Sequence, residues 1–341
     1  MPRVLKSFAV LAFLSALAVA GPRLSWGASS RIFPASYTEY TVCPSGCDFS
    51  SIGLAEVTTT VDLGAAGGIV VTVSLGTYDE RVTISGATNG SAENYRVFRG
   101  ASRTNRPLVA YSGGIGFFVG VGVLQVNADY GEPVTEQWVC LYDFDVTYTG
   151  TTTNNLAGVY TTIAGQGRFV GLWVHDVTSP AAGAAYGIWM NSPGNTVINC
   201  IAARNKLANF YTSDDDNVFY NCTSYDATER DFFKDVGAST GSAINCIAQE
   251  SQIPGFTYSG AAWTALTDCL VDAPVLFVDA AGDDFRLQED DTAAKDQGTD
   301  ESAIYTDDYA GTTRPYGAAF DIGAYEWIPG GAAWPHLIQW W

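Results

Sequence analysis

The sequence predicts an all-β protein: a single-stranded, right-handed parallel β-helix, or solenoid, with a short N-terminal capping helix. The first observation is an Asn-Cys or Asp-Cys pair that recurs at intervals of 22, 24 and 23 residues, at 199–200, 221–222, 245–246 and 268–269. The second is that short runs of alternating apolar and polar residues, separated by Gly, Asn, Asp or Ser, surround each pair, as is typical of strands and turns. The third is composition, since 36 Gly and only 2 Met disfavour long helices.

A repeat of this length accommodates one coil of three short strands and their turns. Strands of successive coils pair about 4.8 Å apart, so equivalent positions form ladders along the core. The expected core ladder is Leu172, Cys200, Cys222, Cys246 and Cys269. The Asn before each Cys is expected at a bend, where its amide bonds backbone groups of the next coil. A β-propeller is the main alternative, but its blades need about twice this period.

The N-terminus carries the features of a targeting signal. Arg3 and Lys6 precede an apolar run at 8–20 that ends in Ala-Val-Ala. This pattern predicts a signal peptide within residues 1–28, and therefore a secreted protein, extracellular or on the cell surface. An uncleaved anchor is the alternative. No later segment is apolar over enough residues to span a membrane.

The rest of the chain is expected to divide into three parts: an N-terminal cap at 29–68, a β-helix with its closing segment at 69–327, and an aromatic tail at 328–341. The apolar stretch 49–63 predicts a helix over the first coil, because the open end of a stack exposes unpaired strand edges. The tail, with Trp334, Trp340 and Trp341, is predicted either to cover the last coil or to contact another surface. The oligomeric state is left open.

Charge and cysteine content limit the partners. A net charge of −19 excludes nucleic acid, which needs a basic face. Acidic turns are candidate sites for Ca²⁺, although the favoured explanation of the charge is that it keeps a β surface in solution. Cys43 and Cys47 are close enough in the chain to form a local disulfide in an exported protein.

Several segments are similar to one group of proteins. Gly-Thr-Tyr at 76–78, within the segment 69–84, and Asp-Ile-Gly-Ala-Tyr-Glu at 321–326 carry the likeness. On these residues the chain, over about 40–327, resembles the right-handed β-helix repeat proteins of the pectate-lyase-like superfamily, and its C-terminus resembles bacterial secreted and surface members. The resemblance implies the fold. It implies no single activity, since the superfamily includes lyases, hydrolases, epimerases and proteins with no known catalysis.

One strand of each coil suggests a binding surface. Its uniformly apolar positions are placed inward: Val159, Ile188, Phe210, Phe232 and Phe256. By alternation the next residues point outward: Tyr160, Trp189, Tyr211 and Phe233. These four form a candidate exposed ladder on which sugar rings stack, with Asn191 and Asn209 bonding hydroxyl groups. The alternatives are that long loops cover the rings or that the register is off by one.

Charged residues supply weaker candidates. Asp214, Asp215 and Asp216 are a candidate Ca²⁺ site or acid–base pair for glycoside hydrolysis, but an ordinary Asx turn is favoured. The candidate catalytic residues, including bases for a β-elimination, are Arg204, Lys206, Asp231 and Lys234; the alternative is that they pair with nearby acids. His175-Asp176 is a candidate orienting pair, with a surface position favoured.

The function predicted from these observations is that of a secreted β-helix protein that binds polysaccharide on one face of the solenoid. Two alternatives stay open. One is a polysaccharide lyase or glycoside hydrolase that acts on uronate-containing glycans. The other is a purely structural or adhesive surface protein.

Overall fold

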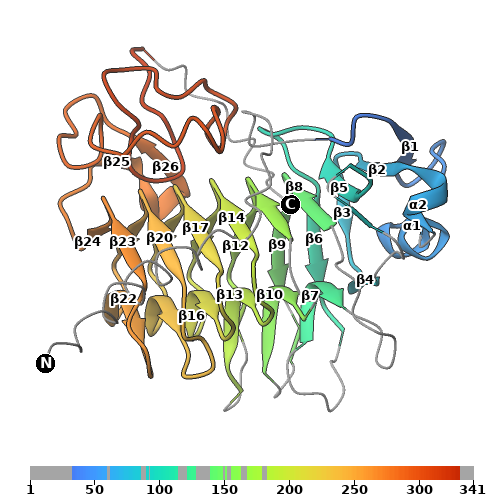
Figure 1. Ribbon diagram of the computed structural model, residues 1–341, viewed down its shortest axis with the longest axis horizontal. Helices are drawn as coiled ribbons and strands as arrows, with labels where there is room; N and C mark the ends of the chain where they lie inside the picture. Colours follow the sequence, from blue (N-terminus) through green and yellow to red (C-terminus); the bar gives the residue numbers. More distant parts are fainter. Residues whose placement is uncertain are drawn as a thin grey trace, which may run out of the picture.

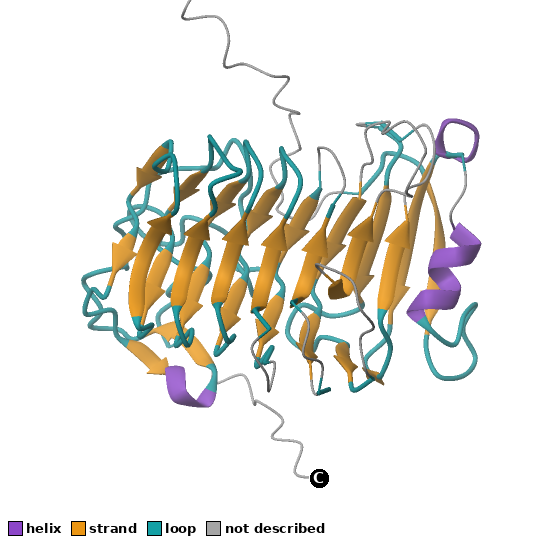
Figure 2. Ribbon diagram, turned by 90° about the horizontal axis from the view of Figure 1, so that it is seen from below, coloured by secondary structure: helices purple, strands orange, loops and turns teal. Residues whose placement is uncertain are grey.

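The computed structural model describes residues 33–330 except 60–61, 86–89, 92, 114–120, 128–138, 149, 152–154, 163–166 and 179–182. It is a stack of coils along one axis, with three long parallel sheets as its walls (Figures 1 and 2). The expected signal peptide and the tail residues Trp334, Trp340 and Trp341 lie outside the described residues.

The strands occupy the three sheets in a repeating order. In spatial order, the nine-stranded sheet contains β1 (Tyr37–Val42), β2 (Gly68–Val73), β5 (Arg96–Gly100), β8 (Val139–Tyr142), β11 (Arg168–Val170), β14 (Thr196–Ile198), β17 (Val218–Tyr220), β20 (Ser242–Ile244) and β23 (Ala265–Thr267). The eight-stranded sheet contains β3 (Thr77–Tyr78), β6 (Leu108–Tyr111), β9 (Asp145–Tyr148), β12 (Trp173–His175), β15 (Ile201–Ala203), β18 (Thr223–Tyr225), β21 (Ile247–Gln249) and β24 (Leu270–Val271). The seven-stranded sheet contains β4 (Val82–Ser85), β7 (Val121–Asn127), β10 (Leu156–Thr161), β13 (Ala185–Met190), β16 (Ala208–Thr212), β19 (Arg230–Lys234) and β22 (Ile253–Tyr258).

From β2 to β24, consecutive strands along the chain therefore lie in different sheets, and each strand from β5 onward pairs in parallel with the strand three positions earlier, its equivalent in the previous coil. For example, β14 follows β11, β12 and β13 and pairs with β11. This is the topology of a parallel β-helix, and the predicted fold class is confirmed.

The interior contains the predicted ladder. Leu172, Cys200, Cys222 and Cys246 are fully buried on successive coils, and Cys269 packs against them. Each thiol is near a backbone carbonyl, as in the 3.4 Å contact from Cys222 Sγ to the Tyr220 oxygen. A second ladder stacks phenylalanine rings; it consists of Phe210, Phe232 and Phe256, with centroids 4.6 Å apart at both steps. Burial of each such side chain contributes about 1.5–3 kcal/mol.

The asparagine before each cysteine lies at a tight bend between two sheets. Asn199, Asn221 and Asn245 have φ values of 50°, 47° and 54°, a left-handed conformation that asparagine tolerates. Their amides mainly bond residues 273–327, here called the closing segment, and not the backbone of the next coil as expected. The bonds run from Asn199 Nδ2 to Asp307 O (2.6 Å), from Asn221 Nδ2 to Gly323 O (2.8 Å) and from Asn245 Nδ2 to Thr299 O (2.9 Å). The expectation was wrong because the closing segment packs along this corner and presents the nearest carbonyl groups.

The closing segment begins after the last coil and returns along the outside of the stack, drawn in orange to red in Figure 1. It contains an antiparallel hairpin of β25 (Phe277–Asp279) and β26 (Asp284–Leu287), joined by the short 3-10 helix η1 (Ala280–Gly282). Its apolar residues pack on outward-facing side chains of the eight-stranded sheet, such as Ile201 and Ile247.

The opposite end carries the predicted capping helix. In α1 (Ile52–Thr59), Ile52 and Ala55 are fully buried against the core, and Glu80 accepts hydrogen bonds from the backbone nitrogens of Ile52 (2.8 Å) and Gly53 (2.9 Å). The short helix α2 (Leu63–Ala66) follows, and β1, which precedes α1, pairs with β2. Cys43 and Cys47 form the expected disulfide, with their Cα atoms 5.6 Å apart. Among the described residues, no helix is long and apolar enough to cross a membrane.

Replacing Asn221 tests the role of the corner asparagines. We expect Asn221→Ala to lower the free energy of unfolding by about 3 kcal/mol, because buried carbonyls of the closing segment lose their donor and alanine is strained at positive φ. Asn221→Gly removes only the side-chain bonds and should cost less. Urea unfolding measures both, and an unchanged midpoint for Asn221→Ala would contradict this account.

Candidate functional site

A cleft of about 500 Å³ lies between the outer face of the eight-stranded sheet and the closing segment. It is called the Trp173 cleft here. From the sheet it is lined by Asp145, Trp173 and Ile201; from the loop after β5, by Arg103, Thr104, Asn105 and Arg106; and from the closing segment, by Gly282, Asp283, Phe285, Arg286, Tyr309, Ala310 and Tyr325.

Strand pairing places the cleft floor on three consecutive coils. Asp145 in β9 is the register partner of Trp173 in β12, which in turn is the partner of Ile201 in β15. Val174 is fully buried in the core, so Trp173 and His175 on either side of it point outward by alternation. The Trp173 ring stacks on the His175 ring at 4.7 Å and meets the Phe285 ring at 5.7 Å. The indole is therefore held in place while part of it stays exposed.

His175 lies between two carboxylates. Its Nε2 is 2.9 Å from Asp145 Oδ1, and its Nδ1 is 2.6 Å from Asp176 Oδ2. Burial lowers the pKa of His175, but the hydrogen bonds and charges of these two acids outweigh it and raise the pKa to about 9. The ring is therefore an imidazolium at neutral pH. The structure thus places His175 in an ion-pair cluster on the outer face of the sheet, beside the cleft, with its side chain 18% exposed.

Arg204 extends the cluster to the closing segment. It donates to Asp176 from Nε (2.9 Å) and to Asp283 from Nη1 (2.6 Å). Burial opposes ionisation of Asp176, but hydrogen bonds from His175 and Arg204 hold its pKa well below its usual range. The side chains of three coils and of the closing segment are thereby joined in one chain of alternating charges.

The other arginines of the cleft are also held by neighbours. Arg106 lies over the Tyr309 ring at 3.7 Å and donates to the Gly171 oxygen at 2.8 Å. Arg103 pairs with Asp307 at 2.8 Å. Arg286 donates from Nε to Asp284 at 2.8 Å. Guanidinium groups fixed in this way are pre-organised donors.

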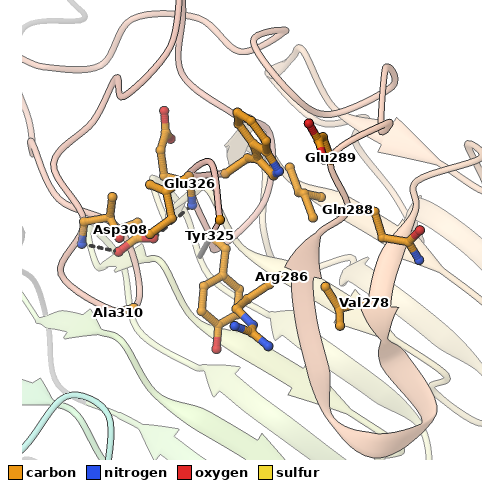
Figure 3. A pocket seen from close by; sticks show the side chains of 13 residues that line it. Val278, Arg286, Gln288, Glu289, Asp308, Ala310, Tyr325 and Glu326 are labelled. Carbon is orange, nitrogen blue, oxygen red and sulfur yellow. Dashed lines mark hydrogen bonds between the residues drawn. The ribbon is translucent and has the colours of Figure 1, made fainter. Parts of the chain in front are cut away.

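A second cavity of about 410 Å³ adjoins the cleft at Arg286, Ala310 and Tyr325 (Figure 3). At its edge, Asp308 accepts hydrogen bonds from the backbone nitrogens of Thr312 (2.6 Å) and Glu326 (2.9 Å). Burial raises the pKa of Asp308, and it raises the pKa of Glu326 to about 7. Glu326 pairs with Arg314 at 2.8 Å, with both side chains fully buried. These acids hold the closing segment together and are not presented to a ligand.

The aromatic ladder has the predicted register but not the predicted exposure. Tyr160, Trp189, Tyr211 and Phe233 are successive partners in the seven-stranded sheet. Their exposed fractions are 4%, 8%, 5% and 9%. The expectation of an open platform is therefore wrong. Tyr211 stacks on Phe233 and on Tyr186, whose ring lies 4.4 Å away, while Trp189 meets Tyr160 edge-on and Tyr211 at a tilt. Neighbouring rings therefore cover each other.

The two asparagines assigned to this surface differ in position. Asn191 borders the ladder, where it donates to the Tyr160 hydroxyl (2.9 Å) and accepts from Ser213 Oγ (2.6 Å). Asn209 is fully buried and donates to Ser224 Oγ at 2.8 Å, so its outward assignment was wrong. Regular pairing in these strands is interrupted once per coil, at Gly158, Gly187, Asn209 and Asp231. Across these pairs of strands the offset between partners is the same on both sides of each break, so no strand gains a residue there, but Asn209 and the adjacent Phe210 are both buried and the alternation is interrupted at this point.

The four catalytic candidates do not converge. Asp231 is fully buried and accepts from Ser224 and Ser251 at 2.6 Å each, and burial raises its pKa to about 6. Lys234 is fully buried and donates to the Ala238 oxygen at 2.6 Å. Lys206 donates to the Gly183 oxygen at 3.1 Å. Arg204 alone reaches the Trp173 cleft, through Asp283.

The acidic run at 214–216 forms a turn. Asp215 accepts from the backbone nitrogens of Ser239 and Thr240, and Asp216 accepts from Thr240 Oγ1 at 2.8 Å. Asp214 accepts from the nitrogen of Asp215 at 2.8 Å. No group of three metal-ligating side chains comes together within the described part of the chain. The turn interpretation accounts for all of these contacts.

The Trp173 cleft was not predicted. Its polar residues come from segments as far apart as Arg103 and Tyr325, and no motif joins them. The alternation in Trp173-Val174-His175, with an apolar residue between two outward rings, was the one local signal for it.

Comparisons with known proteins add little to this picture. No family model and no curated protein matches the chain. Among solved structures, it is similar to a pectin methylesterase from Aspergillus niger (15% identity, TM-score 0.37, covering 67% of this chain and 83% of that one) and to one from carrot (12%, 0.37, 70% and 78%). It is also similar to the pectate lyase Pel9A (14%, 0.34, 87% and 98%). Likenesses this distant carry no argument about chemistry, and the classification rests on the strand pairing: the chain is a parallel β-helix protein with an aromatic, arginine-lined cleft.

The charge state of His175 makes the stability of the folded protein depend on pH. Because its pKa is raised from 6.5 to about 9 by folding, the cluster stabilises the protein fully below pH 6.5, and this stabilisation is lost as the pH rises through 9. We expect a loss of up to about 3 kcal/mol over that range.

The measurement is urea unfolding at several pH values, with His175→Gln as the matched control that lacks this dependence. The sequence has only 2 His, so NMR can follow the titration of His175 directly. A His175 resonance that titrates near 6.5 would contradict the assignment.

Proposed function

We propose that this chain is exported and binds a polysaccharide in the Trp173 cleft. The observation that carries the proposal is a partly exposed indole, held by stacking on the cleft floor and surrounded by fixed guanidinium and carboxylate groups. Carbohydrates present apolar C–H faces, which stack on an indole, and many hydroxyl groups, which form hydrogen bonds with guanidinium and carboxylate groups.

The indole supplies the apolar contact. Trp173 is braced on one side by His175 and at its edge by Phe285. A ring that is already ordered loses little side-chain entropy when a ligand stacks on it. The volume of about 500 Å³ lies within the range typical of ligand pockets.

The charged groups supply directional contacts. Arg103, Arg106 and Arg286 line the cleft together with Asp145 and Asp283. Each has a partner that fixes its direction, and carboxylates and guanidinium groups keep further acceptor and donor positions when paired. Hydroxyl groups both donate and accept hydrogen bonds. A cleft lined by guanidinium and carboxylate groups therefore suits them better than one lined by guanidinium groups alone.

The seven-stranded sheet supports binding less well. Its aromatic ladder offers rings that are each less than one tenth exposed, so little apolar surface is available there. The cleft is therefore the preferred surface for the same predicted ligand class.

Catalysis is not part of the proposal. Asp231 and Lys234 are fully buried, and Arg204 is committed to two carboxylates. A β-elimination needs a base that reaches the proton beside the uronate carboxylate. We therefore expect no unsaturated product, followed by its ultraviolet absorbance, when the protein is incubated with pectin or alginate, with or without calcium. Product formation would establish a lyase instead.

Trp173→Ala tests the binding surface. We expect about a tenfold loss of affinity for the retained polysaccharide, since removing one aromatic stacking surface costs on the order of 1.4 kcal/mol. Affinity electrophoresis in gels that contain neutral or uronate polysaccharides identifies the ligand, and calorimetry then gives the affinities.

Trp189→Ala, on the seven-stranded sheet, is the matched control and should leave retention unchanged. Circular dichroism confirms that both variants fold. If Trp189→Ala loses retention while Trp173→Ala keeps it, the ladder is the binding surface and the cleft proposal is wrong.

A further inference from the structure

The second cavity adjoins the Trp173 cleft along three residues, Arg286, Ala310 and Tyr325. Its volume of about 410 Å³ is close to the 500 Å³ of the cleft, and both volumes lie in the range typical of ligand pockets. The rest of its lining includes exposed or partly exposed side chains, among them Gln288, Glu289 and Trp327 (Figure 3).

The second cavity contains an indole, as the cleft does. Trp327 is partly exposed, and the Lys295 ammonium lies 4.2 Å from the centre of its ring. Lys295 is itself held, because it donates to the carbonyl oxygen of Glu289. In the cleft, the Arg204 guanidinium carbon lies 5.8 Å from the centre of the Trp173 ring. A cation is attracted to the face of an indole, so cleft and cavity each present a restrained, partly exposed indole.

Polar groups border the second indole. Gln288 is exposed, and its Nε2 donates to the Phe277 oxygen at 2.6 Å, which fixes the direction of the amide. An amide oxygen accepts two hydrogen bonds, and a threonine hydroxyl, such as that of Thr312 in the same lining, both donates and accepts. The second cavity therefore repeats the combination of an indole and fixed polar groups that supports the proposed function of the cleft.

Arg286 and Tyr325 form the junction between cleft and cavity. Arg286 Nε donates to Asp284 at 2.8 Å, and the Tyr325 ring lies 5.0 Å from the Tyr309 ring. Asp284 and Tyr309 are both buried, whereas Arg286 and Tyr325 are partly exposed. The two junction side chains are thus held by buried neighbours. A ligand that extends from the cleft into the second cavity meets a fixed guanidinium group and a fixed phenol ring on the way.

We propose that the second cavity is a second sugar-binding subsite, in which the glycan bound on Trp173 places further sugar residues on Trp327. This inference rests on the proposed function, and it makes the ligand a glycan chain of several residues instead of a single sugar. Once one part of a chain is bound in the cleft, the next part reaches the second cavity at a high effective concentration. Affinity should therefore increase with the length of the chain.

A series of oligosaccharides tests the second subsite. Affinity electrophoresis first selects the polysaccharide that the protein retains, from xylan, galactomannan, hydroxyethyl cellulose, pectin and alginate. Fragments of two to eight residues, prepared from it by partial hydrolysis, are then titrated into the protein by calorimetry. We expect at least a tenfold rise in affinity from the shortest to the longest fragments, because only the long ones reach Trp327.

Two variants test which residues produce this gain. Trp327→Ala should bind the shortest fragments as the wild type does and lose the gain with length. Gln288→Ala should weaken only the long fragments, by about fivefold, since it removes one hydrogen-bonding group. Gln297→Ala is the matched control, because Gln297 is also exposed and donates from Nε2 to a backbone oxygen, that of Lys295, but lines neither cleft nor cavity. Circular dichroism confirms that the variants fold.

The outcomes separate this inference from the proposed function. Equal affinity for all fragment lengths would overturn the second subsite, as would folded Trp327→Ala and Gln288→Ala variants that keep the full gain. In both cases a loss of short-fragment binding in Trp173→Ala would still support the cleft. If the protein retains none of the five polysaccharides, or if Trp173→Ala binds the shortest fragments normally, the proposed function is wrong and the second subsite is wrong with it.

Discussion

Hydrogen bonding between successive coils is the interaction on which the whole structure depends. A single coil of about two dozen residues cannot bury its inner face, and its strand edges are satisfied only by the coil before and after it. Pairing in parallel places equivalent residues directly over each other, which produces the cysteine and phenylalanine ladders. The same constraint places Asp145, Trp173 and Ile201 in one row and so creates the floor of the cleft.

The sequence predicted the architecture and the register because both follow from periodicity. The Asn-Cys pairs mark one point in each coil, and alternation then assigns most side chains to the inside or the outside. This assignment of side chains was wrong for Asn209 and Asp231, where the alternation is interrupted. Both side chains point into the stack and form hydrogen bonds with Ser224. The predicted exposure of the aromatic ladder was also wrong. Alternation shows that these side chains point away from the core, but it does not show how much neighbouring rings cover them.

The cleft could not be predicted because nothing local brings it together. Arg106 and Tyr309 are in contact although 203 residues separate them, and Asp283 reaches Arg204 only because the closing segment turns back along the stack. The charge state of His175 has the same origin: Asp176 is its neighbour in sequence, whereas Asp145 belongs to the previous coil. Long-range folding therefore determines both the shape and the electrostatics of this site.

The closing segment also changes how the solenoid responds to stress. Coils that contact only their neighbours can fray one at a time from an end. Here the segment is bonded to Asn199, Asn221 and Asn245 on three successive coils, and Arg314 reaches the backbone carbonyl of Gly323 inside it. Loosening any of these coils therefore also breaks its bonds to the closing segment. The C-terminal half of the molecule is thereby bound into one cooperative unit, although its repeats alone would behave as a one-dimensional array.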